Sequence, residues 1–276
     1  MSARFAFSQM DVFTGQPGFG NPLAVVHGAA GLDDAAMQRF ANWTNLSETA
    51  FLLPPESPEA DYKVRIFTPK SELPFAGHPT LGSCHAWRAA GGTPKGEFIV
   101  QECGAGLVRI KRDGPRFAFA APDAEQSDIS GALKSRIAAV LRLPEAGILA
   151  ARQLSARAPS WTGVLLKDRA AVLGLQPDFA AMGELEIGVV APSAGGPADF
   201  EVRAFANDVG GEDPVTGSLN AGLARWLINA GLAPARYVAA QGTALGRQGR
   251  VFVAHDGQDF WIGGESVAVI SGTLTL

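Results

Sequence analysis

Two related stretches of the chain each carry a polar residue directly before a proline, where a side chain could bind a ligand or move a proton. The first stretch is Phe75–Ser83, with His78 before its proline, and the second is Glu212–Ser218, with Asp213 in that place. In both stretches a Gly-Ser pair follows the proline after two residues. The two polar residues are 213 − 78 = 135 positions apart, close to half of the 276-residue chain. The sequence therefore predicts two halves of one design.

Each motif is expected to open a helix, because proline suits the first helical position, where its missing N–H costs nothing. We expect these helices to start near Pro79 and Pro214. A helix N-terminus has unbonded N–H groups and a partial positive charge, so it attracts anions. Gly77 and Gly217 would let a ligand approach the backbone closely. Two such helix ends facing one cleft would suit a small carboxylate substrate.

Glu48 is the candidate proton carrier. It ends a polar corner, Asn45–Glu48, directly before the apolar run Thr49–Leu53. Partial burial there would raise the pKa of its carboxyl towards neutrality, as a proton shuttle requires. The alternative is a solvated glutamate at the edge of a strand.

Simpler and rival roles stay open for these residues. His78 and Asp213 could only cap their helices, a role for which aspartate is much better suited than histidine. Ser218, His78 and Asp213 could form a hydrolase triad, but no Gly-x-Ser-x-Gly elbow surrounds Ser218. A metal could bind His78 and His85, yet no acidic or histidine cluster with ligand spacing accompanies them. We therefore expect no metal.

Composition narrows the class of protein. Hydrophobic residues make up 47% and charged residues 18%, which fits a packed globule, and the net charge of −4 offers no basic field for nucleic acid. No signal-like N-terminus and no apolar run of about 18 residues are present, so we expect a cytoplasmic protein without membrane partners. The two cysteines, Cys84 and Cys103, are expected as buried thiols. No dinucleotide fingerprint or phosphate loop occurs, so no cofactor is predicted.

The elements that must position these residues repeat in each half. Several short, β-branched strand patterns surround one largely apolar run, 80–90 in the first half and 214–230 in the second. A helix that is apolar on most sides needs sheet around it. We therefore predict an α+β fold of two pseudo-symmetric domains, each a mainly antiparallel, barrel-like sheet around a central helix. The expected domains are residues 1–121 and 122–276, with the C-terminal strand able to pair with the first domain, and the ligand cleft lies between the halves.

Several motifs together resemble the PhzF (phenazine biosynthesis-like) family, over nearly the whole chain. The motifs are Asp11-Val12-Phe13-Thr14, Gly20-Asn21-Pro22-Leu23-Ala24-Val25-Val26, Asn45-Leu46-Ser47-Glu48-Thr49-Ala50-Phe51, Phe75-Ala76-Gly77-His78-Pro79-Thr80, Glu212-Asp213-Pro214-Val215-Thr216-Gly217-Ser218, Gln241-Gly242 and Gly246-Arg247. The resemblance implies the diaminopimelate-epimerase-like fold and cofactor-free isomerisation, usually in a homodimer. The best-known member isomerises trans-2,3-dihydro-3-hydroxyanthranilate.

The resemblance also assigns roles. It implies that Glu48 is the proton shuttle and that His78 and Asp213 line the site as further catalytic residues. Substrate-binding positions fall on three residues of the two helix-start motifs: Gly77, Gly217 and Ser218. The expected substrate is a small carboxylate-bearing molecule.

The sequence also excludes one related mechanism and departs from the family pattern in one place. A two-thiol epimerase needs one cysteine from each half, and here both lie in the first, so that mechanism is excluded. The loop 207–211 and Asn220 differ from the family pattern around the second motif. If they line the pocket, the substrate differs from the phenazine precursor. The alternative function is a binding protein that keeps the cleft without the chemistry.

Overall fold

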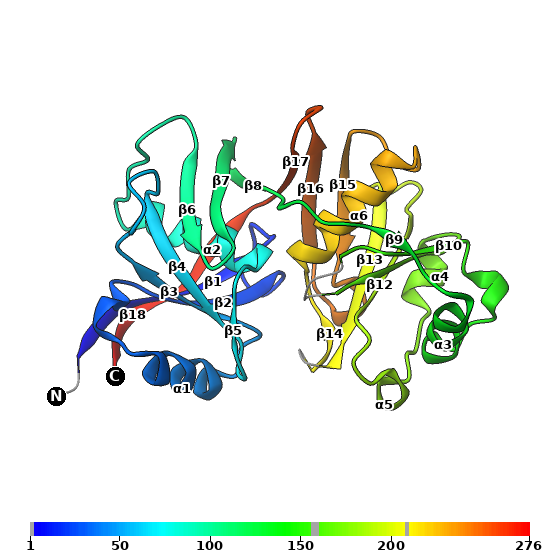
Figure 1. Ribbon diagram of the computed structural model, residues 1–276, viewed down its shortest axis with the longest axis horizontal. Coiled ribbons are helices and arrows are strands. Elements are labelled where there is room, and N and C mark those ends of the chain that lie inside the picture. Colours follow the sequence, from blue (N-terminus) through cyan, green and yellow to red (C-terminus); the bar gives the residue numbers. More distant parts are fainter. Residues whose placement is uncertain (1–2, 156–159, 208–209) are drawn as a thin grey trace. The chain divides into compact units, whose positions relative to one another are not determined.

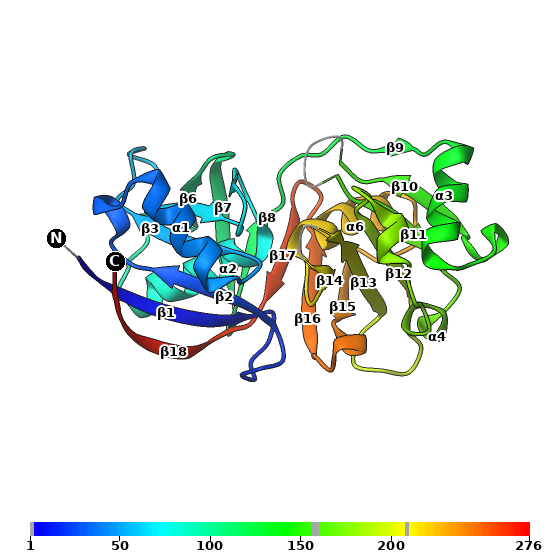
Figure 2. The same cartoon turned by 90° about the horizontal axis from the view of Figure 1, so that it is seen from below.

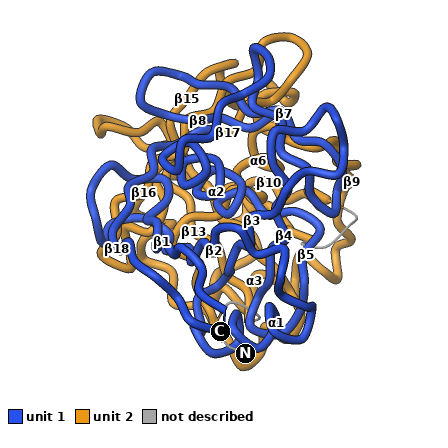
Figure 3. The backbone as a smooth tube through the Cα atoms, turned by 90° about the vertical axis from the view of Figure 1, so that its left-hand side faces the viewer, with its two compact units in different colours: residues 1–120, 263–276 blue, residues 121–262 orange. Residues whose placement is uncertain are grey.

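The computed structural model describes residues 3–155, 160–207 and 210–276, in two compact units. Unit 1 comprises residues 1–120 and 263–276, and unit 2 comprises residues 121–262 (Figure 3). The last strand, β18 (Ser266–Thr275), pairs antiparallel with β1 (Arg4–Val12) along its length. Residues 263–276 therefore belong to unit 1 and do not continue a domain that begins at residue 122.

Unit 1 is a curled sheet with one helix inside and one outside (Figure 1). The helices are α1 (Asp34–Thr44) and α2 (Gly77–Ala89). Besides β1 and β18, the strands are β2 (Asn21–Val26), β3 (Thr49–Leu53), β4 (Tyr62–Phe67), β5 (Glu72–Leu73), β6 (Ile99–Cys103), β7 (Gly106–Asp113) and β8 (Arg116–Ala120). Strand β17 (Phe260–Gly264) crosses the boundary between the units.

Helix α2 is enclosed by the sheet, because it contacts strands β1, β2, β3, β4, β6, β8 and β18. The packing is close enough to require a glycine: a Cβ on Gly82 would lie 2.6 Å from Leu23 Cδ2. Helix α1 covers the other face of the sheet, where Met37 and Phe40 pack against Phe51. Its start follows the sequence signal, since Asp33 accepts a hydrogen bond from the Ala36 N–H as N-cap.

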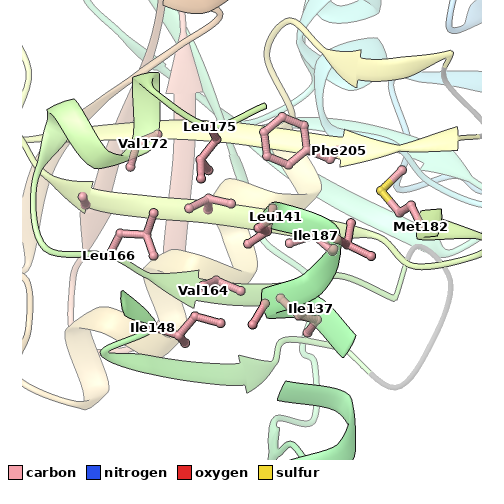
Figure 4. Close-up of a cluster of buried hydrophobic side chains, with 14 residues drawn as sticks. Ile137, Leu141, Ile148, Val164, Leu166, Val172, Leu175, Met182, Ile187 and Phe205 are labelled. Atoms are coloured by element: carbon pink, nitrogen blue, oxygen red, sulfur yellow. The ribbon is translucent and has the colours of Figure 1, made fainter. Parts of the chain in front are cut away.

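Unit 2 repeats this plan with more helices outside. Its helices are α3 (Gly131–Leu141), α4 (Arg169–Leu173), α5 (Phe179–Met182) and α6 (Gly217–Asn229). Its strands are β9 (Ser127–Asp128), β10 (Ala150–Gln153), β11 (Thr162–Leu165), β12 (Ile187–Pro192), β13 (Phe200–Ala206), β14 (Gly211–Asp213), β15 (Arg236–Gln241) and β16 (Gly249–His255). Figure 4 shows the outer core, where Ile137 and Leu141 of α3 point towards Val164 and Ile187 of the strands.

The predicted α+β fold with mainly antiparallel sheets is confirmed, with one addition. Each unit also contains two parallel pairs, β2–β3 and β4–β6 in unit 1 and β11–β12 and β13–β15 in unit 2. Antiparallel neighbours such as β6 and β7 are joined by tight turns, whereas the parallel pairs need longer connections. The central helix forms part of one such connection in each unit.

The two halves repeat at an offset of 140 residues, which corrects the expected offset of 135. The central helices begin at Gly77 and Gly217, and 217 − 77 = 140. The parallel pairs agree, because Tyr62 pairs with Gln101 and Val202 with Gln241, and 241 − 101 = 140. The two prolines thus occupy different places in the two halves.

The central helices do start near Pro79 and Pro214, but neither proline is the first helical residue. Pro79 is the third residue of α2, still within the first turn, where N–H groups have no partner inside the helix. Pro214 lies before α6, whose N-cap is Thr216 in an extended conformation. Proline fits both places because neither requires a helical N–H.

Among the described residues, no helix is long and apolar enough to cross a membrane. Both cysteines are free and buried in unit 1, as expected: Cys84 in α2 and Cys103 at the end of β6. Burial raises the pKa of both thiols.

These thiols should be inert in the native protein, since the thiolate is the reactive form. We expect neither Cys84 nor Cys103 to react with a disulfide reagent such as DTNB until the chain is unfolded. Release of thionitrobenzoate, followed with and without guanidinium chloride, measures this. Rapid titration of both thiols in the native protein would contradict the buried placement.

Candidate functional site

Glu48 and His78 form a buried pair in unit 1. Glu48 directly precedes β3 and is only 9% exposed, so the solvated alternative is wrong. Its Oε2 lies 3.4 Å from Nε2 of His78, which is itself 4% exposed. At this distance the two side chains can form an ion pair when the imidazole is protonated, and direct proton exchange requires an approach to about 2.6–3.2 Å.

The second ring nitrogen of His78 faces β2. His78 is the second residue of α2, so it lies inside the helix and does not cap it; the N-cap is Ala76, which makes no side-chain cap bond. The Nδ1 atom of His78 lies 3.4 Å from Nδ2 of Asn21, the first residue of β2. Three elements therefore bring a carboxylate, an imidazole and an amide together at the start of α2.

The turn before β2 explains how Asn21 is held. Asp11 Oδ2 accepts hydrogen bonds from the N–H groups of Gly18 at 2.6 Å and Gly20 at 3.1 Å. A Cβ on Gly20 would lie 2.2 Å from the Val12 carbonyl oxygen, so only glycine fits. Asp11, Gly20 and Asn21 belong to the motifs that resemble the family, but the resemblance predicted no part in the site for them.

Asp213 is a buried acid of unit 2, at the end of β14. It is 7% exposed, and its Oδ2 accepts a hydrogen bond from the Thr216 hydroxyl at 2.5 Å. Asp213 does not cap α6, since Thr216 occupies the N-cap position. The capping alternative is therefore wrong for Asp213 as well.

A buried glutamine, Gln241, holds the segment from Asp213 to Thr216 in place by hydrogen bonds. The Nε2 atom of Gln241 donates to the Asp213 carbonyl oxygen at 3.1 Å and to Thr216 Oγ1 at 2.9 Å. Its Oε1 accepts from the Thr216 N–H at 3.1 Å and from Asn220 Nδ2 at 2.8 Å. Asn220 also donates to the Thr216 carbonyl, and it is fully buried, so it supports this corner and lines no open surface.

Ser218 occupies in α6 the place that His78 occupies in α2. It is the second helical residue, and Trp161 Nε1 lies 3.1 Å from its hydroxyl oxygen. Ser218 is thus bonded to tryptophan, His78 faces Glu48 and Asn21, and Asp213 is bonded to Thr216. None of these contacts joins two members of the hydrolase triad.

The remaining polar features do not form a metal site. In the described parts of the chain no group of three or more His, Cys, Asp and Glu residues could hold a metal ion. His85 shares α2 with His78, but its ring meets that of Phe117 edge-on. Within the loop 207–211, Asp208 and Val209 lie outside the described residues, and Asn207 donates to the carbonyl oxygens of Phe179 and Gly183.

Comparison with known proteins gives a consistent result. The profile of the family described as Phenazine biosynthesis-like protein (PhzC-PhzF) matches residues 10–272. The chain is 35% identical to a Schizosaccharomyces pombe protein named Antisense-enhancing sequence 1, over 97% of both chains. It is 33% identical, over 98% of both chains, to a Pseudomonas aeruginosa protein named an uncharacterized isomerase. A crystal structure of a PhzF-family phenazine biosynthesis protein from Bacillus anthracis superposes with a TM-score of 0.85, covering 99% of this chain and 100% of the other at 22% identity, which shows the same fold.

Substitution of Gly242 measures how closely the backbone is packed beside Asp213 and Pro214. The φ of Gly242 is +89°, and a Cβ there would lie 2.7 Å from the Pro214 carbonyl oxygen. Gly246 has a similar φ of +72° but open space around it. We expect Gly246→Ala to cost about 1–2 kcal/mol of unfolding free energy from backbone strain. Gly242→Ala should cost about 1–3 kcal/mol more, because the methyl group has no room.

Urea denaturation of both variants measures this difference. Equal losses of unfolding free energy in Gly242→Ala and Gly246→Ala would show that the backbone near Pro214 yields easily, against the close contact described.

Proposed function

This chain belongs to the phenazine biosynthesis-like (PhzF) family of isomerases, and from that membership we propose that it moves a proton on a small carboxylate-bearing substrate without a cofactor. The observation that carries the proposal is the buried Glu48 carboxylate, 3.4 Å from His78 at the start of α2. Glu48 acts as the acid and base, and His78 as its partner. We also propose that the protein acts in the cytoplasm.

In the proposed reaction a single carboxyl group both removes and returns the proton. Ionised Glu48 takes a proton from a carbon next to an electron-withdrawing group, and the electron pair moves into the conjugated system. The protonated Glu48 then returns the proton to another carbon of the same molecule. The net change is a shift of one hydrogen and one double bond, so no oxidant or reductant is consumed.

We propose, from the family membership alone, that Gly77, Gly217, Ser218 and Asp213 bind the substrate. Gly77 and Gly217 are the first residues of α2 and α6, and the N-terminal turn of a helix supplies partial positive charge for a carboxylate. Ser218 hydrogen-bonds the substrate, and Asp213 binds a hydroxyl or amino group beside the reacting carbon. The family's dihydroaromatic substrate, trans-2,3-dihydro-3-hydroxyanthranilate, carries all of these groups and is the first substrate to test.

Glu48→Gln should abolish turnover while leaving substrate binding close to wild type. Glutamine keeps the shape and hydrogen-bonding capacity of the side chain but has no proton to transfer, and general acid–base help is worth ~10²–10⁴-fold. Product formation gives kcat, and calorimetric titration gives the dissociation constant. In heavy water, wild-type product should gain deuterium at the carbon that receives the proton.

Glu201→Gln is the matched control, because it changes another buried glutamate away from the proposed chemistry. Glu201 lies in β13, is 1% exposed and accepts a hydrogen bond from Arg169 Nε at 2.9 Å. It should lose stability and keep its turnover. If Glu48→Gln turns over within a few-fold of wild type, Glu48 is not the proton carrier. Binding by the wild type without turnover would favour the binding-protein alternative, and hydrolysis of an ester would favour the hydrolase.

We also propose that the chain acts as a homodimer, through a surface of unit 1 formed by α1 and β18. Trp43 on α1 is 79% exposed, and Val269 and Ile270 on β18 are about half exposed. No charged residue occurs from Ser266 to Leu276. Exposed strands of this kind are normally protected by charges or by a partner. Figure 2 shows β18 running beside β1 along this surface.

The same surface carries features that complement one another. Trp43 borders two grooves, of about 550 and 410 Å³, so the surface offers both a projecting side chain and hollows that could receive one. The larger groove carries Asp33 and Arg39, charges of opposite sign that two copies can pair. A twofold dimer requires this kind of self-complementary patch.

Ile270→Lys should convert the dimer to a monomer, because a lysine cannot be buried unpaired at the contact. Sedimentation velocity at micromolar concentration measures the state. Leu149→Lys is the control, since Leu149 is 59% exposed but lies in unit 2. A wild-type protein that sediments as a monomer, or a dimer unaffected by Ile270→Lys, would contradict the proposed surface.

A further inference from the structure

We propose that Thr216 and Gln241 are positioning residues, which fix the orientation of the Asp213 carboxylate for the reaction. This inference rests on the proposed role of Asp213 at the substrate. Neither residue needs to touch the substrate, because both act through Asp213. Gln241 is fully buried and Thr216 nearly so.

The direction of each hydrogen bond follows from the donor count. A threonine hydroxyl has one proton and two lone pairs. Gln241 Nε2 lies 2.9 Å from Thr216 Oγ1 and can only donate to it. The single proton of Thr216 is then available for Asp213 Oδ2, 2.5 Å away. Thr216 therefore holds the Asp213 carboxylate as an acceptor in one orientation.

The orientation of the Gln241 amide is itself determined. Its oxygen receives the backbone N–H of Thr216 and the side-chain amide of Asn220. Exchanging the oxygen and nitrogen of Gln241 would set two donors against each other at the Thr216 N–H, so only one arrangement satisfies the network. The Thr216 backbone N–H can only donate, so it fixes which atom of the Gln241 amide accepts. This in turn fixes the direction of the hydrogen bonds from Gln241 to Thr216 and from Thr216 to Asp213.

Unit 1 contains the related clamp without a carboxylate at its end. Gln101 Nε2 donates to Thr80 Oγ1 at 3.0 Å, and Thr80 donates to the Ala76 carbonyl at 2.9 Å. Both clamps hold the first turn of a central helix. By the offset of 140 residues, Thr80 occupies the place of Asn220 and Ala76 that of Thr216, so the hydroxyl that bonds Asp213 is an addition of unit 2. Thr80 is therefore a control by chemistry, because it is a buried threonine that accepts from the equivalent glutamine and donates to a carbonyl oxygen.

The test compares Thr216→Val with Thr216→Ser, each alone and combined with Asp213→Asn. Valine fits the extended backbone of Thr216 but lacks the hydroxyl, whereas serine keeps it. With trans-2,3-dihydro-3-hydroxyanthranilate as the probe, Thr216→Val should lower kcat by ~10- to 100-fold, the worth of a hydrogen bond to a charged group. KM should change much less, and Thr216→Ser should restore most of kcat.

Combination with Asp213→Asn separates positioning from stability. The loss caused by Thr216→Val should disappear when Asp213 is already asparagine, because the two residues act as one unit. Thr80→Val should lower the unfolding midpoint similarly, and its effect should persist unchanged in the Asp213→Asn background. Additive losses for Thr216→Val and Asp213→Asn would overturn the proposal.

A crystal structure of each Thr216 variant gives a readout that does not depend on turnover. We expect the Asp213 carboxylate to move by more than about 0.5 Å, the usual tolerance of a working site, in Thr216→Val and to stay in place in Thr216→Ser. An unmoved Asp213 in Thr216→Val overturns the positioning role. If Asp213 moves but Asp213→Asn keeps wild-type turnover, the positioning stands and the proposed catalytic role of Asp213 fails.

Discussion

The fold of each unit depends on hydrogen bonds at the start of its central helix. The helix is apolar and enclosed by sheet, but its N-terminal turn still has polar groups. These groups must find partners inside the protein, because water is excluded there. In unit 2 the fully buried Gln241 accepts from the Thr216 N–H, and in unit 1 the fully buried Gln101 donates to the Thr80 hydroxyl of the first turn. Losing either amide would leave several buried polar groups unsatisfied. Both glutamines therefore support the first turn of a central helix, which carries the second helical residue.

That second residue differs between the halves although its surroundings correspond. His78 faces Asn21 and Ser218 faces Trp161, and both comparisons have the same offset, 218 − 78 = 140 and 161 − 21 = 140. One scaffold thus presents an imidazole in unit 1 and a hydroxyl in unit 2. The shared framework conserves the place of a side chain, while the residue type sets its chemistry. Different chemistry can therefore arise without changing the helix, the strands or the clamp.

Local rules predicted much of the fold from the sequence. The two largely apolar central helices were predicted correctly, because their signal depends on neighbouring residues. The helices start within three residues of the two prolines, but proline does not fix the first helical residue, because it also fits the positions that Pro79 and Pro214 occupy. The burial of Glu48 could not be predicted from its sequence neighbours, because it depends on contact with His78 of α2, thirty residues further along the chain. The Gln101–Gln241 repeat was the signal that could have given the offset of 140.

The offset of 140 residues also shows that unit 2 has no glutamate at the place equivalent to Glu48. Thr49 of β3 corresponds to Val189 of β12, since their parallel partners Ala24 and Val164 are likewise 140 residues apart. Glu48 therefore corresponds to Gly188, where a Cβ would lie 2.1 Å from Leu219 Cδ1. Unit 2 fills this place with a leucine from its own central helix and has no room for an acid.

A racemase with two bases takes a proton on one face and returns another on the opposite face, so it needs an acid or thiol from each half. Here the glutamate position has become glycine in unit 2, and both cysteines lie in unit 1. These asymmetries exclude two equivalent carriers, whether a pair of glutamates or a pair of thiols, at matching places in the two halves. The packing of Leu219 against Gly188 thus makes Glu48 a feature of unit 1 alone, and any second acid from unit 2 must come from a different place in the repeat, as Asp213 does.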